Sequence, residues 1–155
     1  MAVLRHLIAR DGGLRLSDET VDWTALDQYS GQTVPLRLPG MWLGNRWLGQ
    51  NPDPDVLTPV LDDAAQITQG PVTIFQQMNE NGDMLRVATT IQDAEGRRAI
   101  GTYIPAKLPD GTPNPVISEV LQGRTYHGRA LVLNAWHLAI YEPLRNEQGV
   151  PMGML

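Results

Sequence analysis

The sequence of residues 72–104 is VTIFQQMNENGDMLRVATTIQDAEGRRAIGTYI, and its apolar residues largely follow a period of two. This period is typical of β-strands and predicts strands at 72–79, 84–92 and 97–104. The two intervening segments, Asn-Glu-Asn-Gly and Asp-Ala-Glu-Gly, have the composition of tight turns. The stretch therefore predicts three successive strands joined by short turns, which is an antiparallel arrangement.

Two more strands are predicted further along the chain, at 126–133 and 136–144, by the same kind of pattern. A turn ending at Gly149 leads into a last strand at the end of the sequence. The strands follow one another without a long helix between each pair. This order indicates an α+β domain with a mostly antiparallel sheet.

Two short helices are predicted beside these strands, at 58–69 and 115–122. Each begins with a capping residue followed by proline, Thr58-Pro59 in the first helix and Asn114-Pro115 in the second. A glycine ends each helix, and in the first helix it is Gly70. The second helix lies between the third and fourth predicted strands.

The first fifty residues divide into two parts. Residues 1–10 place Leu4, Leu7 and Ile8 on one face at the helical period, which predicts the end of an amphipathic helix. Residues 14–50 show little periodicity, but they contain three of the four tryptophans. Aromatic residues in this number indicate that the segment packs against the domain.

Composition limits the function classes that fit the chain. Its 155 residues suit one domain, and 42% of them are hydrophobic, which is enough for a packed core. The net charge is −5 and no basic stripe is present, so a nucleic-acid partner is not expected. No apolar run has the length of a membrane span. The abrupt ending in a strand-like segment suggests a fragment of a longer protein.

The residues needed for catalysis or metal binding do not form a recognisable set. Cysteine is absent, the serines lie outside any nucleophile motif, and the histidines have no metal-ligand spacing. His127 and His137 lie on predicted strands, where surface or core histidines are more common than ligands. We therefore expect no enzyme activity, no metal and no cofactor. A cytosolic enzyme with an unrecognised site stays open as an alternative, as does an interaction module that binds no small molecule.

Arginine and aromatic side chains on the predicted strands are the candidates for ligand binding. A guanidinium binds a carboxylate with two parallel hydrogen bonds, and aromatic walls remove water from the rest of a small ligand. The candidate residues are Arg86, Arg98, Tyr103, Tyr126 and Trp136. The alternative for each arginine is that it reaches solvent or binds an internal carboxylate such as Glu119 or Glu142.

Strand alternation limits how many of these side chains can share one pocket. Arg86 is expected on the same face as Met84 and Ala88. Arg98 and Tyr103 fall on opposite faces of their strand unless a bulge intervenes. The pocket is therefore expected over the second to fifth predicted strands, with Arg86 and Trp136 as its strongest candidates.

Residues 40–155 resemble the single-Cache sensor domain of bacterial methyl-accepting chemotaxis proteins in the order and spacing of their motifs, and residues 1–39 resemble it more loosely. The matching segments are Trp47–Asn51, Thr73–Asn79, Gly82–Thr90, Arg98–Pro105, Asn114–Ile117, Gly123–Ala130, Asn134–Trp136, Ile140–Leu144 and Gly153–Leu155. The membrane helices and the signalling module of that family are absent from the sequence.

The resemblance implies a PAS-like Cache fold over residues 1–155, with a long N-terminal helix, a central antiparallel sheet and short covering helices. It implies a periplasmic domain of an inner-membrane receptor that is a homodimer at full length, with both chain ends at the same end of the domain. The implied ligand is a small organic acid, such as acetate, propionate or pyruvate. The same sensor fold also serves as the input domain of histidine kinases and cyclic-dinucleotide enzymes, and this alternative stays open.

Overall fold

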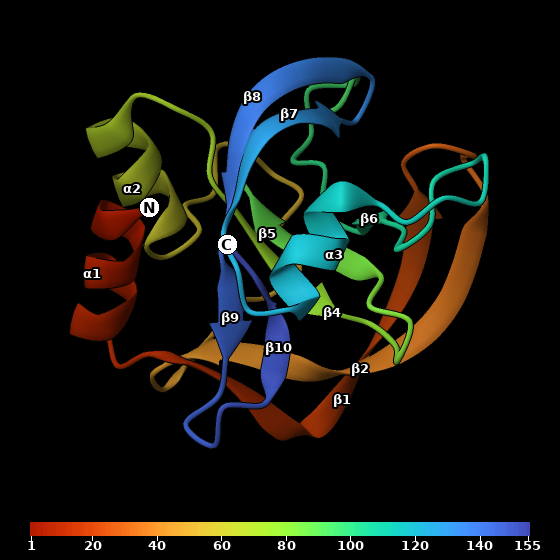
Figure 1. Cartoon of the computed structure of the whole chain (residues 1–155). Helices are drawn as coiled ribbons and strands as arrows, with labels where there is room; N and C mark the ends of the chain where they lie inside the picture. The colour runs from red at the N-terminus through yellow and green to blue at the C-terminus, as the bar shows by residue number, and fades with distance from the viewer.

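The computed structural model describes all 155 residues as an α+β fold, with a mixed eight-stranded sheet, a separate two-stranded ribbon and three short helices (Figure 1). The elements are, in chain order, α1 (Ala2–Arg10), β1 (Leu14–Asp27), β2 (Thr33–Leu43), β3 (Arg46–Trp47), α2 (Leu61–Thr68), β4 (Thr73–Gln77), β5 (Met84–Thr89), β6 (Thr102–Ile104), α3 (Pro115–Leu121), β7 (Tyr126–Val132), β8 (Ala135–Tyr141), β9 (Pro143–Arg145) and β10 (Pro151–Met154). The predicted fold class is therefore confirmed.

The strand order in the large sheet is β3-β2-β1-β6-β5-β4-β10-β9. All neighbouring pairs described by their register are antiparallel except β1 and β6, which run parallel. The three strands predicted within residues 72–104 are β4, β5 and β6, side by side. The third strand is shorter than expected, because Arg98 is held by a distant loop and Gly101 has a φ of 80°.

The predicted strands 126–133 and 136–144 exist as β7 and β8, but they are not part of the large sheet. They pair only with each other, from Tyr126↔Tyr141 to Val132↔Ala135, and form a ribbon that arches over the domain (Figure 1). Ala130 and Tyr141 from this ribbon are buried against the face of the sheet. The alternation of side chains predicts a strand but does not say whether its neighbour lies in the sheet or above it.

The segment 14–50 forms a long hairpin, β1 and β2, which the sequence did not predict. Within β1 only Trp23 and Ala25 are buried, while Leu14, Leu16 and Val21 are half-buried and seven of the fourteen residues are exposed. The register of β1 against β2 shifts between Leu16 and Thr20, so no single period of two runs through the whole strand. Of the tryptophans in this segment, Trp23 is buried and Trp47 is 45% exposed.

The helices agree with the prediction to different degrees. α3 begins at Asn114 as expected, with its side-chain oxygen accepting a hydrogen bond from the Val116 amide at 3.0 Å. α2 begins later than predicted, because Thr58 is not its cap and instead donates its amide to Asp62 at 2.7 Å. α2 ends at Thr68, and the residue that caps it in the left-handed conformation is Gln69 rather than Gly70. α1 covers the nine residues Ala2–Arg10, where the end of an amphipathic helix was predicted.

Two hydrophobic cores lie on opposite faces of the sheet. The larger core contains the buried face of α1, α2, the β1–β2 hairpin and the side chains of Ile74 and Leu85. The smaller core contains α3, the β7–β8 ribbon and the side chains of Phe75 and Met84. No helix in the structure combines the length and the apolar character that crossing a membrane requires.

Candidate functional site

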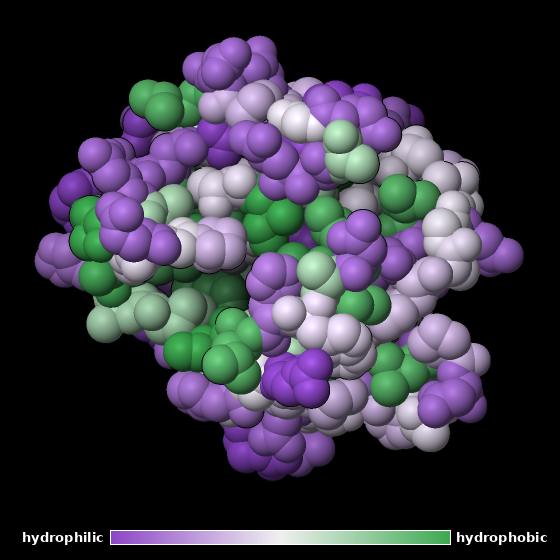
Figure 2. Space-filling view, turned by 90° about the horizontal axis from the view of Figure 1, so that it is seen from above, coloured by the Kyte–Doolittle hydropathy of each residue, from purple (hydrophilic) through white to green (hydrophobic).

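The principal pocket lies between the start of α1, the segment that joins α2 to β4, and the β7–β8 ribbon. Its volume is about 600 Å³, which is in the range of small-molecule sites. Arg86 and Phe75 are the deepest of the side chains that line it, since they are 0% and 1% exposed. The space-filling view from above shows a recess with apolar residues inside it and mostly polar residues around it (Figure 2).

Arg86 lies on β5 directly opposite Phe75 on β4, and its guanidinium carbon is 4.9 Å from the centre of the Phe75 ring. Its Nη1 donates a hydrogen bond to the Thr102 hydroxyl. Its Nε and Nη2 have no hydrogen-bond partner in the protein, although both are buried. No carboxylate pairs with Arg86. A buried guanidinium in this state carries a large desolvation cost that an anion would offset.

Burial changes the ionisation of the two groups at this end of the pocket. Desolvation lowers the pKa of Arg86 to about 10, so its guanidinium is still a cation at neutral pH. Desolvation also raises the pKa of the Tyr141 phenol, although the neighbouring charge of Arg86 acts in the opposite direction. Tyr141 is therefore a neutral phenol at neutral pH. The deep end of the pocket thus combines one positive charge with aromatic rings.

The rest of the pocket wall is mostly apolar and carries no negative side chain. Leu4 comes from α1, Val72 from the segment before β4, and Leu138 and Ile140 from β8. Arg86 is the only arginine or lysine among the lining residues, and no aspartate or glutamate is present. The site therefore offers one buried cation below a largely hydrophobic chamber. The described residues include no cluster of metal-binding side chains.

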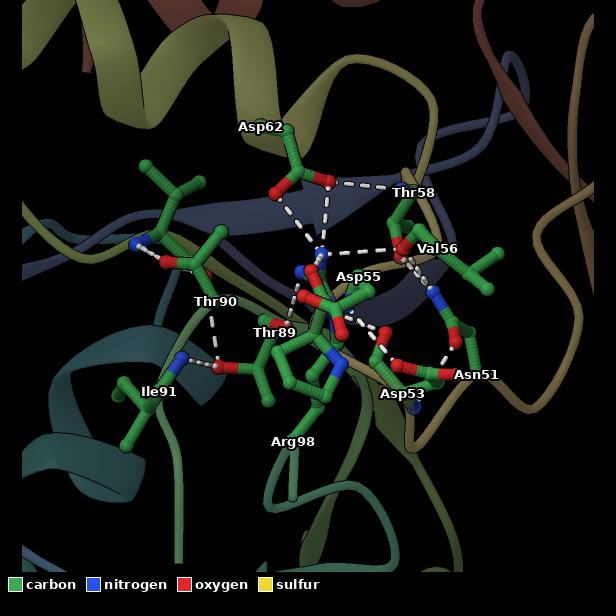
Figure 3. A network of polar contacts seen from close by, with 12 residues as sticks. Asn51, Asp53, Asp55, Val56, Thr58, Asp62, Thr89, Thr90, Ile91 and Arg98 are labelled. Carbon is green, nitrogen blue, oxygen red and sulfur yellow. Dashed lines mark hydrogen bonds and ion pairs between the residues drawn. The ribbon is translucent and has the colours of Figure 1, made fainter. Parts of the chain in front are cut away.

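Arg98 lies outside this pocket, in a network of internal contacts (Figure 3). Its Nη2 binds both oxygens of Asp62, at 2.9 and 3.1 Å. Its remaining nitrogens donate to the backbone carbonyls of Asp53 and Thr89, at 3.1 and 3.0 Å. Nη2 also donates to the Val56 carbonyl at 3.1 Å. Arg98 therefore has the internal carboxylate that the alternative interpretation required, and it connects the loop before α2 to the sheet.

The other three candidate residues also lie outside the pocket lining. Tyr103 packs against the larger core on the opposite side of the sheet. The Tyr126 hydroxyl donates to the Arg129 carbonyl at 2.7 Å, and its ring is 6.4 Å from that of Tyr141. Trp136 is 61% exposed and lies 5.5 Å from the Arg129 guanidinium. The structure thus places Arg86 alone of the five candidates in the pocket.

A β-bulge explains part of this difference. Ile74 is opposite Ala88 while Phe75 is opposite Arg86, so Val87 is an extra residue in β5. Met84 lies on the Arg86 side of the sheet as predicted, but Ala88 belongs to the opposite core. The pocket uses β5 and β8 as expected, whereas β6 contributes no lining residue.

Phe75 and Tyr141 are the phenylalanine and tyrosine of the pocket lining, and the sequence analysis named neither as a candidate. The position of Phe75 follows from the register of β4 against β5, which the bulge shifts. Tyr141 reaches the site because β8 folds back over the sheet, and its ring lies 6.0 Å from that of Phe75. The one feature of the sequence that could have indicated this site is the aromatic residue Phe75, on the strand next to that of Arg86.

Comparison with known families gives one match. The family model described as the Cache 3/Cache 2 fusion domain matches residues 1–155. No curated protein and no solved structure matches the chain.

Proposed function

The chain belongs to the Cache 3/Cache 2 fusion domain family, and from this premise we propose that it is the ligand-sensing domain of a bacterial chemoreceptor that responds to a small organic acid. Cache domains are extracytoplasmic sensor domains of signalling receptors, and they bind small molecules without catalysing a reaction. The receptor type and the class of ligand are our proposal.

Arg86 is the observation that carries the proposal for the ligand. Its guanidinium is fully buried, it has no internal carboxylate, and two of its nitrogens have no acceptor in the protein. Arg86 is one of the residues that line the pocket, and the pocket wall holds no competing negative side chain. A carboxylate would accept hydrogen bonds from the free nitrogens and neutralise the charge. A purely internal ion pair would instead have given Arg86 a carboxylate partner, as Asp62 is for Arg98.

The arrangement of the chain ends supports the place of the domain in a receptor. Met1 and Leu155 both line the ligand pocket, so the two ends lie close together (Figure 1). We propose that the domain lies in the periplasm, between two membrane helices of an inner-membrane receptor. We also propose that the full-length receptor is a homodimer, as is expected for a chemoreceptor.

Binding measurements on the wild type and on two Arg86 variants test the ligand proposal. Arg86→Met removes the charge with little change in length, and Arg86→Lys keeps a charge but loses the planar fork. A carboxylate at 100 times its dissociation constant should stabilise the wild type by about 2.7 kcal/mol. Both variants should lose most of this stabilisation. Binding that survives Arg86→Met, in a protein that still unfolds cooperatively, would contradict the proposal.

A further inference from the structure

We infer that the acid bound in this pocket is a monocarboxylate with a sizeable apolar body, whose carboxylate meets Arg86 and whose hydrocarbon part lies between β8 and the start of α1. This inference rests on the proposed function, and it specifies the class of acid. It differs from the short acids that the sequence resemblance implies. Three features of the pocket support it: its size, its apolar wall and its distribution of charge.

The size of the pocket exceeds what the shortest acids need. A volume of about 600 Å³ corresponds to about 20 water molecules in the liquid. An acid of two carbons would fill only about a fifth of this space, and the rest would hold water against an apolar wall. By the same count, an acid with a body of about six to ten carbons occupies about half of the space and displaces water from the apolar wall.

The wall above Arg86 is suited to hydrocarbon. Leu4, Val72 and Ile91 line the pocket on the side of the helices and the sheet, and Leu138 and Ile140 line it on the side of the ribbon. Leu138 is 88% exposed and Ile140 is 44% exposed, although both belong to the pocket. An apolar ligand body that extends from Arg86 toward β8 would cover part of this exposed surface.

The distribution of charge excludes several other kinds of acid. An amino acid carries an ammonium group, and the lining offers no aspartate or glutamate to receive it. A short dicarboxylate carries a second anion, and the lining offers no second arginine or lysine. His137 is the other basic side chain of the lining, and it is exposed on β8 rather than buried beside Arg86. A single carboxylate is the charge that this site can neutralise.

Titration calorimetry with a series of straight-chain acids tests the inference. Acetate, butanoate, hexanoate and octanoate share one carboxylate and differ only in the hydrocarbon part. The affinity should rise about fourfold for each added methylene until the pocket is filled. Phenylpropanoate tests whether an aromatic body serves as well as an aliphatic one. Octan-1-ol, octylamine, adipate and 2-aminohexanoate are the controls for charge, and each should bind more weakly than the acid of similar length.

Two variants test separately whether the carboxylate binds at Arg86 and whether the hydrocarbon part lies against β8. Arg86→Met should weaken every acid by about 30-fold or more, since it removes the only partner of the carboxylate. Leu138→Asn lies at an exposed position and should fold normally. It should weaken octanoate several-fold and leave butanoate unchanged.

The possible outcomes separate this inference from the proposed function. If acids bind through Arg86 but the affinity is flat or greatest for acetate, the sensor proposal stands and the apolar-body inference is wrong. A preference for adipate or 2-aminohexanoate also overturns the inference alone. If no acid binds, or if binding does not depend on Arg86, both are wrong.

Discussion

The contacts of Arg98 with Asp62 should stabilise the fold, and Asp62→Asn is the substitution that tests this with least change in volume. The Arg98 side chain is 3% exposed, and that of Asp62 is 26% exposed. Removing one partner of a buried pair costs about 3–5 kcal/mol in general. Here the backbone carbonyls of Asp53 and Thr89 still accept from Arg98, and Asp62 is partly in contact with solvent. We therefore expect a loss of about 2–3 kcal/mol.

Urea denaturation followed by circular dichroism measures this loss, and the midpoint should fall without a change in slope. In a domain of this length the same loss lowers the melting temperature by about 5–10 °C. Asp22→Asn is the matched control, because Asp22 and Arg37 form an ion pair of similar length that is exposed at both ends. Exposed pairs contribute little to stability, so this variant should unfold like the wild type.

A second variant distinguishes a structural role of Arg98 from a role in ligand binding. Arg98→Met should lower the free energy of unfolding by at least as much as Asp62→Asn, and the folded protein should keep its affinity for acids. A variant with unchanged stability and abolished acid binding would refute the structural role and return Arg98 to the ligand site.

Three further predictions concern single positions. Arg86→Met should raise the free energy of unfolding of the ligand-free protein by about 1–3 kcal/mol, because it removes a buried charge that has no counterion. Urea denaturation measures this gain, and a loss of stability would show that Arg86 is well paired. Gly153→Ala should destabilise the domain by about 3 kcal/mol or more in the same assay, since the added Cβ would lie 1.9 Å from the Phe75 carbonyl oxygen. An unchanged denaturation midpoint would contradict the close pairing of β10 with β4. Asn114→Ala should cost about 1 kcal/mol by removing the cap of α3, and Asn114→Asp should keep most of that stability.

The sequence predicts the strands whose apolar residues recur regularly and misses those in which the pattern is interrupted. β4 and β5 are largely buried in the middle of the sheet, and their apolar residues are dense and regular. β1 and β2 contribute Trp23, Leu38 and Met41 to the larger core, but the register shift between Leu16 and Thr20 interrupts the alternation of side chains along the hairpin. The position of the β7–β8 ribbon above the sheet depends on packing, which the period of two does not encode.

The site was predictable to the extent that a charged residue inside an apolar strand is unusual. Arg86 stands out for this reason, and it is the residue that the pocket reaches. Arg98 has the same local signal, but its partner Asp62 lies 36 positions earlier in the chain. Phe75 and Tyr141 come to Arg86 through a bulge and through the folding back of the ribbon. Neither the bulge nor the position of the ribbon is determined by the residues that flank Phe75 or Tyr141 in the sequence.

The ribbon has a mechanical consequence that follows from how it is attached. Directly after β8, the amide and carbonyl of Glu142 form two backbone hydrogen bonds with Leu155, at 3.1 and 2.9 Å. Leu155 directly follows β10, which pairs with β4 beside Arg86. The ribbon shares no strand pairing with the eight-stranded ladder, and the side chains of Ala130 and Tyr141 hold it against the smaller core. A ligand that alters the packing of β8 therefore acts one residue away from a direct backbone connection to the last strand of the chain.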